Sequence, residues 1–196
     1  MSAELPVRVA ESGADGGRRK HVLNAALLVF ARYGYRKASM EEVARAADIS
    51  RPGLYFHFSS KQELFQAAVA HSLDDALAAA QAALADPNRP LRDRLIEAFD
   101  AWTGRYVGPL AAEIGTLIEN SPGLLGAMAT EYPDRFAGSL TEGLATKAGR
   151  LPADREIAPA DVAQTLLATA SGIKHDVSTR DEFRTRMSIA VDLYRP

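Results

Sequence analysis

The sequence predicts an all-α protein, with a small N-terminal three-helix domain joined by a long helix to a larger C-terminal helical domain. Apolar residues recur at helical spacing along most of the chain. Residues that favour helix N-termini precede several of these runs. No alternating run of β-branched residues and no hairpin dipeptide between such runs indicates a strand. The expected division is a flexible tail over residues 1–17, the three-helix domain over 18–62 and the larger domain over 63–196.

Composition narrows the class of protein. The chain has 196 residues, 47% of them hydrophobic, which is enough to form a substantial core. It has no cysteine, and this excludes disulfides, thiol catalysis, cysteine-ligated zinc and iron–sulfur clusters. Its N-terminus lacks the apolar run of a secretory signal, and no stretch is apolar enough to span a membrane. We therefore expect a soluble, cytoplasmic protein with no membrane partner.

Enzymatic chemistry has little support in the sequence. Glu113 and Glu119 form a carboxylate pair without a convincing partner. The histidines lack the i, i+4 spacing of a metal-binding helix, and they are His21, His57, His71 and His175. We predict no catalytic residue, no metal and no cofactor, so the expected protein is not an enzyme.

Charge is distributed unevenly along the chain. The net charge is −2, but residues 18–61 contain nine Lys and Arg side chains against three Asp and Glu. A basic N-terminal module fused to an acidic body predicts that only the first part binds a polyanion. Chance asymmetry of solvated faces is the alternative interpretation of this pattern.

The N-terminal helices have clear start and stop signals. A helical stripe begins after Arg18 and ends before Gly34, which supplies a C-terminal stop. Ser39 with Glu42 forms a predicted capping box, Ser50 is placed to cap the next helix, and a second capping box is expected in the run Ser60–Glu63. The first stripe comprises Val22, Leu23, Ala26, Val29, Phe30 and Tyr33.

The larger domain is predicted to contain several further helices. The long helix from Ser60 is expected to end before the run Asp86-Pro87-Asn88. Predicted helices then cover residues 91–106, 110–118, 122–150 with an interruption at Pro133, 159–176 and 179–194.

A long helix, a short helix, a tight turn and another short helix form a helix-turn-helix, the geometry that places a recognition helix in the major groove of DNA. Buried residues predicted to hold the two short helices together are Val43, Ala44, Ala47, Ile49, Leu54 and Phe58. This block resembles the DNA-binding domain of the TetR family of bacterial regulators, above all in the run Ile49-Ser-Arg-Pro-Gly-Leu-Tyr-Phe-His-Phe-Ser-Ser-Lys. Further matches are Gly34-Tyr35 and Ser39, and, near the other end of the chain, Gly172-Ile-Lys-His.

The resemblance implies roles for individual residues in this block. Ser39 and Ser50 would offer hydroxyls and helix N-termini to phosphates, Tyr55 its phenol, and Lys61 its ammonium. Arg51 is the expected base reader, because a guanidinium chelates guanine O6 and N7. For the serines, helix capping without DNA contact is the alternative. The candidate DNA-binding set is Ser39, Ser50, Arg51, Gly53, Tyr55, His57 and Lys61.

Three positions depart from the family pattern. Gly53 stands where a hydroxylated residue or alanine is frequent, so a possible base contact is missing. Phe56 replaces a residue that is often polar or basic. Asp48 replaces a common turn glycine, although Asp tolerates left-handed backbone geometry better than most residues.

The resemblance also implies an effector pocket and a dimer interface in the larger domain. The expected pocket residues lie on two helical stripes, for which simple core packing is the alternative, and they are His71, Phe99, Trp102, Tyr106, Met128 and Tyr132. The last two helices would form a two-fold homodimer. The seam predicted for this interface comprises Val162, Leu166, Ala170, Ile173, Val177, Phe183, Met187, Val191 and Tyr194.

The sequence therefore predicts a DNA-binding transcriptional regulator, expected to be a repressor. As a homodimer it would bind a palindromic double-stranded operator, and a small-molecule effector would release it. A helix-turn-helix protein without an effector is the first alternative. An all-α enzyme and a helical scaffold without DNA binding are the others.

Overall fold

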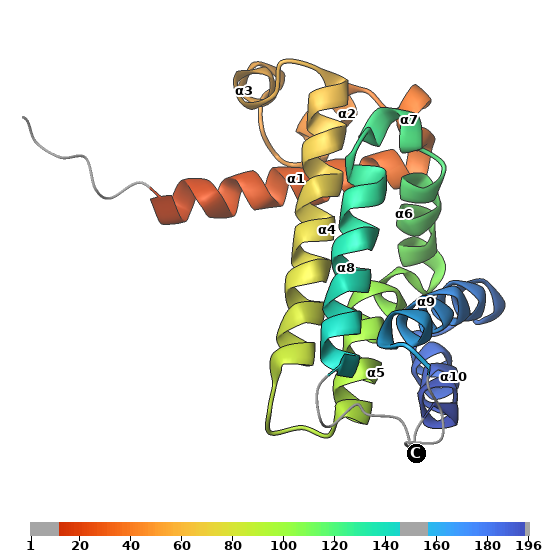
Figure 1. Ribbon diagram of the computed structural model, residues 1–196. Helices are drawn as coiled ribbons and strands as arrows, with labels where there is room; N and C mark the ends of the chain where they lie inside the picture. Colours follow the sequence, from red (N-terminus) through yellow and green to blue (C-terminus); the bar gives the residue numbers. More distant parts are fainter. Residues whose placement is uncertain (1–11, 146–156, 195–196) are drawn as a thin grey trace, which may run out of the picture. The chain divides into compact units, whose positions relative to one another are not determined.

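The computed structural model describes residues 12–145 and 157–194, and within these residues every regular element is helical (Figure 1). The chain divides into two compact units, Met1–His71 and Ser72–Pro196. The division falls inside one long helix, at His71. Residues 1–11 of the predicted tail lie outside the described residues.

The N-terminal unit contains α1 (Ser12–Lys37), α2 (Met40–Ala46), α3 (Arg51–His57) and the start of α4 (Lys61–Ala85). Helix α1 begins at Ser12, not at Arg18 as predicted, so residues 12–17 are helical rather than tail. Extending an existing helix adds one hydrogen bond per residue fixed, whereas starting one is costly, so even a glycine-containing run can continue a stable helix. Gly34 has a φ of 76° and breaks the helical geometry, as predicted.

Aromatic side chains form the centre of the N-terminal core. Phe30 and Phe65 are fully buried and meet edge to face, with 5.2 Å between their ring centroids. The ring of Tyr35 lies 5.1 Å from that of Phe65. These contacts join α1 to the first turns of α4, which carry the chain away from α3.

The C-terminal unit contains the rest of α4 and a bundle of further helices. Within it α8 packs on α9, and α10 packs on both α5 and α9. The elements are α5 (Leu91–Trp102), the 3₁₀ helix η1 (Gly104–Tyr106), α6 (Pro109–Glu119), α7 (Pro122–Leu125), α8 (Met128–Ala145), α9 (Pro159–Asp176) and α10 (Arg180–Leu193).

Two of the predicted helices differ from the observed ones. The helix expected over 91–106 ends at Trp102 and is followed by η1. The expected interruption at Pro133 is wrong, because Pro133 lies inside α8 and the break falls at Gly126, which has a φ of 58°. Glycine adopts this left-handed conformation readily, because it has no Cβ.

The predicted dimer seam is largely core. The apolar faces of α9 and α10 pack inside the subunit, which leaves Leu166, Phe183 and Met187 fully buried. Val162, Ala170, Ile173 and Val191 are buried with them. An apolar stripe shows that a helix face is covered, but not whether the cover comes from the same chain or another.

Long-range ion pairs join α5 to α10. The carboxylate of Asp100, buried on α5, accepts hydrogen bonds from Arg180 Nε and Nη2 at 2.8 and 2.9 Å. Arg184 donates to the same carboxylate at 2.5 Å. The bonds to Asp100 are the main reason why the pKa of Arg180 is raised. Asp100 therefore fixes α10 against α5 through two guanidinium groups.

Candidate nucleic-acid interface and ligand pocket

Local hydrogen bonds cap the start of α2, and a left-handed residue forms the turn between α2 and α3. Ser39 Oγ accepts from the Glu42 N–H at 3.2 Å, and the Glu42 carboxylate accepts from the Ser39 N–H at 2.8 Å. This reciprocal capping box confirms the prediction for α2. Asp48 has a φ of 51°, so it occupies the left-handed turn position where we expected Asp to be tolerated.

Helix α3 presents a polar face to solvent. Ser50 Oγ accepts from the Gly53 N–H at 3.1 Å and caps the helix, as predicted. Leu54, in α3, and Phe58, its C-cap, are fully buried and hold the helix against the unit. Arg51, Tyr55 and His57 are exposed and Gly53 is half-buried, as the sequence indicated. Helix α3 thus has the exposure that a recognition helix requires.

The absence of a side chain at Gly53 has a structural reason, and it also removes a possible contact from α3. A Cβ built at this position would lie 3.1 Å from Ser50 Oγ, closer than ordinary van der Waals contact. A larger residue would therefore displace the capping hydroxyl by a few tenths of an ångström. Glycine keeps the cap and leaves this part of α3 without a side chain.

Arg51, the expected base reader, has two exposed partners. Its Nη1 lies 4.0 Å from a carboxylate oxygen of Glu41, and its guanidinium lies 5.8 Å from the centre of the Tyr55 ring. Both side chains of the ion pair are more than half exposed, so the pair contributes little energy. Another ligand can therefore replace Glu41 beside Arg51 at small cost.

Lys61 makes more contacts within the protein than predicted. Its ammonium donates to the carbonyl oxygens of Arg36 at 3.3 Å and Ala38 at 3.1 Å, and lies 4.7 Å from the Tyr35 ring centre. The Lys61 ammonium therefore binds backbone carbonyls around the C-terminus of α1. A cation there is stabilised by the negative end of the helix dipole. Since an ammonium has three N–H donors, a phosphate contact by Lys61 stays a prediction.

The predicted capping box of α4 forms only in part. Ser60 Oγ accepts from the Glu63 N–H at 3.1 Å, but the Glu63 carboxylate turns to Ser59 instead of Ser60. It accepts the Ser59 N–H at 2.8 Å and the Ser59 hydroxyl at 2.6 Å. These hydrogen bonds from Ser59 lower the pKa of Glu63.

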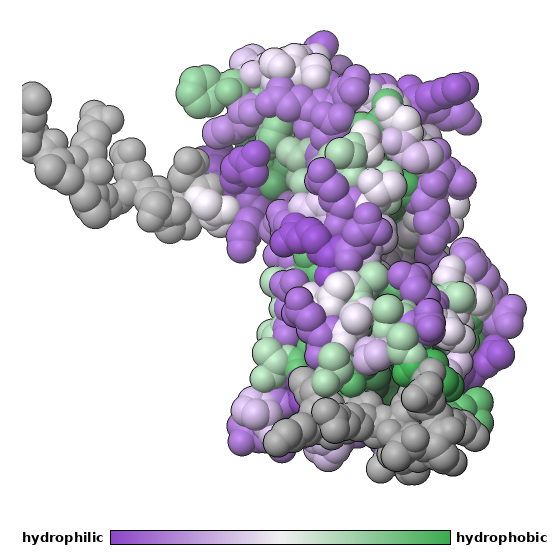
Figure 2. Space-filling view, viewed as in Figure 1, coloured by the Kyte–Doolittle hydropathy of each residue, from purple (hydrophilic) through white to green (hydrophobic). Residues whose placement is uncertain are grey.

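An exposed aromatic residue lies beside the candidate DNA contacts. The Phe56 side chain on α3 is 86% exposed. Figure 2 shows hydrophobic surface over α3 next to hydrophilic residues. The surface of the N-terminal unit also exposes many cations, among them Arg18, Arg19, Lys20, Arg32, Arg36, Lys37 and Arg45. Such a surface suits a polyanion.

The C-terminal unit contains a cavity of about 390 Å³. This volume lies near the lower end of the range for small-molecule sites. Trp102 and Met128 line it, and the Trp102 ring also packs against Phe136, with centroids 4.9 Å apart. Its other lining residues are Leu73, Thr103, Tyr106, Gly115, Ile118, Glu119, Pro122, Leu125, Ala129, Pro133, Leu167, Ser171 and Lys174.

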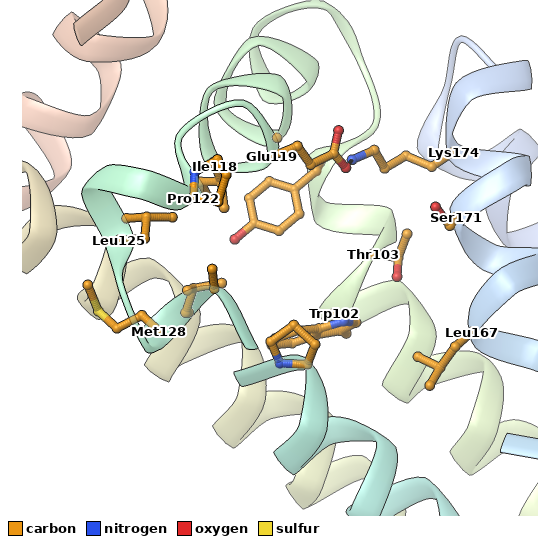
Figure 3. Close-up of a pocket in the computed structure, with 15 residues that line it drawn as sticks. Trp102, Thr103, Ile118, Glu119, Pro122, Leu125, Met128, Leu167, Ser171 and Lys174 are labelled. Atoms are coloured by element: carbon orange, nitrogen blue, oxygen red, sulfur yellow. Dashed lines mark hydrogen bonds and ion pairs between the residues drawn. The ribbon is translucent and has the colours of Figure 1, made fainter. Parts of the chain in front are cut away.

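The cavity is polar at one side and apolar at the other. Figure 3 shows Lys174 and Glu119 meeting beside Ser171, with Leu125 and Met128 across the cavity. Tyr106 shares a hydrogen bond of 3.2 Å with Ser72, and burial raises the pKa of its phenol. The cavity can therefore contact the apolar part of a ligand at one side and a charged or polar group of the ligand at the other.

Half of the predicted effector residues line this cavity. Trp102, Tyr106 and Met128 do, whereas Phe99 and Tyr132 are buried in the packing between helices and His71 is not among the lining residues. The Phe99 ring meets Phe136 edge to face at 5.6 Å. The Tyr132 hydroxyl donates to Asp74 at 2.7 Å, and its pKa is raised to about 12, first by burial. An aromatic stripe cannot distinguish core from cavity lining.

Sequence reasoning missed the charged end of the cavity. Glu119 was noted without a partner, and the partner is Lys174, which lies 55 positions further along the chain. Lys174 also falls in the run Gly172-Ile-Lys-His that was singled out for its resemblance. The sequence drew attention to Glu119 and to Lys174 separately. Only the packing of α6 near α9 shows that the two form a pair.

Comparison with known proteins agrees with this geometry. Residues 22–68 match the family model described as bacterial regulatory proteins, tetR family. Over 84 residues, 42% of this chain, the sequence is 40% identical to the HTH-type transcriptional activator FasR of Mycolicibacterium smegmatis.

Residues 22–68 are therefore similar to the N-terminal domain of TetR-family regulators. The match covers only 38% of the length of FasR.

Two solved structures share the fold over nearly the whole chain. One is a transcriptional regulator from Saccharomonospora viridis in complex with choline, with a TM-score of 0.71 and 17% identity, covering 90% of this chain and 96% of that one. Another is AibR in complex with isovaleryl coenzyme A and operator DNA, with a TM-score of 0.66 and 20% identity, covering 91% and 99%. At these identities the likeness establishes the fold alone.

The described residues contain neither a candidate membrane-spanning helix nor a candidate metal site. In this part of the chain no helix has both the length and the apolar character needed to cross a bilayer. Within the same residues no three His, Asp or Glu side chains gather as metal ligands would.

Proposed function

We propose that this TetR-family protein is a transcriptional regulator that binds a palindromic DNA operator as a homodimer and is released by a small-molecule effector. The observation that carries the proposal is the capped α2–turn–α3 unit with an exposed polar face on α3. Ser39 and Ser50 sit at helix N-termini, where free N–H groups attract phosphate. Phosphate contacts by these residues, Tyr55 and Lys61 would position α3, and Arg51 would read a base.

Selection of bound sequences from a random duplex pool tests DNA binding. We expect recovery of a palindrome whose half-sites lie about one helical turn, roughly 34–36 Å, apart. Recovery of no motif at any salt concentration would exclude sequence-specific regulation.

Arg51→Ala should weaken binding to the selected operator by about 1–3 kcal/mol and relax preference at one position in each half-site. Lys61→Ala serves as the contrast, since loss of a phosphate contact weakens all duplexes alike and reduces the salt slope by about one unit. Fluorescence anisotropy on operator and scrambled duplexes measures both variants. Uniform weakening by Arg51→Ala would make it a phosphate ligand instead of a base reader.

The dimer face should be the outer surface of α9 and α10 rather than the predicted seam. Ile189 and Leu193 on α10 are 57% and 73% exposed, which is unusual for large apolar residues on one helix face. On α9 the exposed residues include Ala168 and Gly172, whose small size allows close approach. Such a face fits a two-fold helical interface.

Ile189→Glu should yield a folded monomer, because the new charge is exposed in the subunit but would be buried in the dimer. Met187→Glu is the matched contrast: it places the charge in the core and should unfold the domain. Light scattering gives the mass and circular dichroism the helicity. If Ile189→Glu stays dimeric at micromolar concentration, the interface lies elsewhere.

Effector release follows from the cavity and from α4. This helix begins three residues after α3 and continues to Ala85, and Leu73 within it lines the cavity. A ligand that shifts α4 would change the spacing of the two recognition helices, by no more than its differential affinity for the two states. Coupling of about 1–3 kcal/mol would weaken operator binding by roughly 5–150-fold.

A regulator without an effector is the competing function. The cavity beside Trp102 favours an effector, and operator titration in the presence of a bound ligand distinguishes the two. A ligand that occupies the cavity and leaves operator affinity unchanged would favour the effector-free alternative. Transcription from an operator-controlled reporter then shows whether DNA binding represses, as we propose.

A further inference from the structure

Lys174 is the buried partner in the ion pair at the charged end of the cavity. Its side chain is 10% exposed, whereas that of Glu119 is 47% exposed. Both residues line the cavity, so a ligand in it can reach either charge (Figure 3). The two partners therefore differ in what they lose when the pair is broken.

This asymmetry decides which partner a ligand can replace. Glu119 can turn to water at little cost, because half of its side chain is solvated already. The ammonium of Lys174 cannot follow it, and a buried cation without an anion is strongly disfavoured. An incoming anion can therefore take the place of Glu119, whereas an incoming cation would leave Lys174 without a partner.

The neighbourhood of Lys174 is shaped around its ammonium. Gly115 on α6 is buried, and a Cβ built there would lie 3.2 Å from Lys174 Nζ and 3.1 Å from Tyr106 Cβ. Any larger residue at position 115 would crowd the ammonium. The hydroxyl-bearing residues Ser171 and Thr103 line the same side of the cavity, so polar groups surround the position of a ligand head group (Figure 3).

We propose that the cavity binds a small carboxylic acid with an apolar body, whose carboxylate displaces Glu119 from Lys174. The body would lie against Trp102, Leu125 and Met128. The cavity volume of about 390 Å³ gives room for a short alkyl chain or an aromatic ring. This inference rests on the proposed function, in which the same cavity receives the effector.

The chain carries its own reporter for this site. Trp102 is the single tryptophan of the sequence and lines the cavity, so its fluorescence responds to occupancy without added label. The probes are 3-phenylpropanoate, 3-phenylpropanamide and 3-phenylpropylamine, which share a skeleton and carry an anionic, a neutral and a cationic head group. Hexanoate, hexanamide and hexylamine repeat the comparison without an aromatic ring.

In the wild-type protein at least one carboxylate should bind about tenfold tighter than its amide, because a charge-assisted pair with Lys174 replaces a neutral hydrogen bond. Lys174→Met keeps the bulk of the side chain and should remove this preference while leaving amide binding unchanged. Glu119→Gln should tighten carboxylate binding several-fold, since it removes the internal competitor. Glu113→Gln, an exposed change on the same helix away from the cavity, is the control and should change nothing.

Each contrary result overturns the proposal. Equal affinity for acid and amide removes the role of Lys174, and tightest binding of the amines makes Glu119 the anchor. Weaker carboxylate binding in Glu119→Gln shows that the pair is structural, and no response to any probe up to about 10 mM rejects this ligand class. The titrations contain no DNA, so their failure leaves DNA binding standing, and failure of the duplex selection leaves them unaffected.

Discussion

The two units of the chain differ in how many of their side-chain hydrogen bonds join distant parts of the sequence. In the N-terminal unit most side-chain hydrogen bonds join residues three or four positions apart, as in Ser39–Glu42, Ser50–Gly53 and Ser59–Glu63. In the C-terminal unit, Arg180–Asp100 and Lys174–Glu119 join residues 80 and 55 positions apart. Local pairs form with a helix end, whereas distant pairs form only when helices pack. Short motifs therefore explain more of the first unit than of the second.

The largest expected effect on stability comes from breaking a distant ion pair, and two aspartates allow this to be tested. Asp100 and Asp192 each accept a bidentate arginine, but their side chains are 4% and 43% exposed. Asp100→Asn should lower the free energy of unfolding by about 1.5–3 kcal/mol, because the buried side chain loses its charge-assisted hydrogen bonds from Arg180 and Arg184. Asp192→Asn should cost less than about 1 kcal/mol. Urea unfolding measures both, and equal losses would show that burial does not set the strength of these pairs.

The two capping boxes, one in each unit, test whether local hydrogen bonds contribute equally to stability in both units. Thr179 caps α10 with Glu182 in the same way as Ser39 caps α2 with Glu42. Ser39→Ala and Thr179→Ala should each cost about 1 kcal/mol, since the lost hydrogen bonds are local in both units. Hydrogen exchange at the first turns of α2 and α10 resolves the two effects. A much larger loss at Thr179 would mean that its cap depends on packing against α5.

The smallest expected effect is a pH dependence of stability. Hydrogen bonds from Ser39, Ser59 and Ser178, respectively, lower the pKa values of Glu42, Glu63 and Glu182 from the ordinary value of 4.5. A carboxylate with a lowered folded-state pKa stabilises the fold above its unfolded pKa, and this stability is lost as the pH falls through the folded value. Replacing the three residues by Gln should therefore lower the melting temperature at pH 7, and the difference from wild type should shrink below about pH 4.5.

Glu113→Gln is the control for this dependence, because it changes one exposed carboxylate on α6 without touching a cap. Melting curves from pH 3.5 to 7 should superimpose for this variant and the wild type. A difference from wild type in the triple variant that stays constant with pH would contradict the proposed contribution of the caps.

The recognition unit was predictable because its signals are local. Ser39, Ser50, the left-handed Asp48 and the exposed face of α3 all followed from residue types at fixed short spacings. The exception was Lys61, whose carbonyl partners lie 23 and 25 positions away. Helix α9 was likewise predicted to its observed bounds, since its start and end depend on neighbouring residues.

By itself the sequence determined the all-helical fold, the order of the helices and the TetR-like helix-turn-helix. Only the tertiary structure decided which stripes are core, which residues line the cavity and which charges meet. Met187 and Ile189 lie on one helix, yet one is buried and the other exposed. Periodicity identifies the faces of a helix, but the neighbouring helices decide what covers each face, and they come from distant parts of the chain. For the same physical reason, Glu119 acquired its partner only when α6 and α9 folded together.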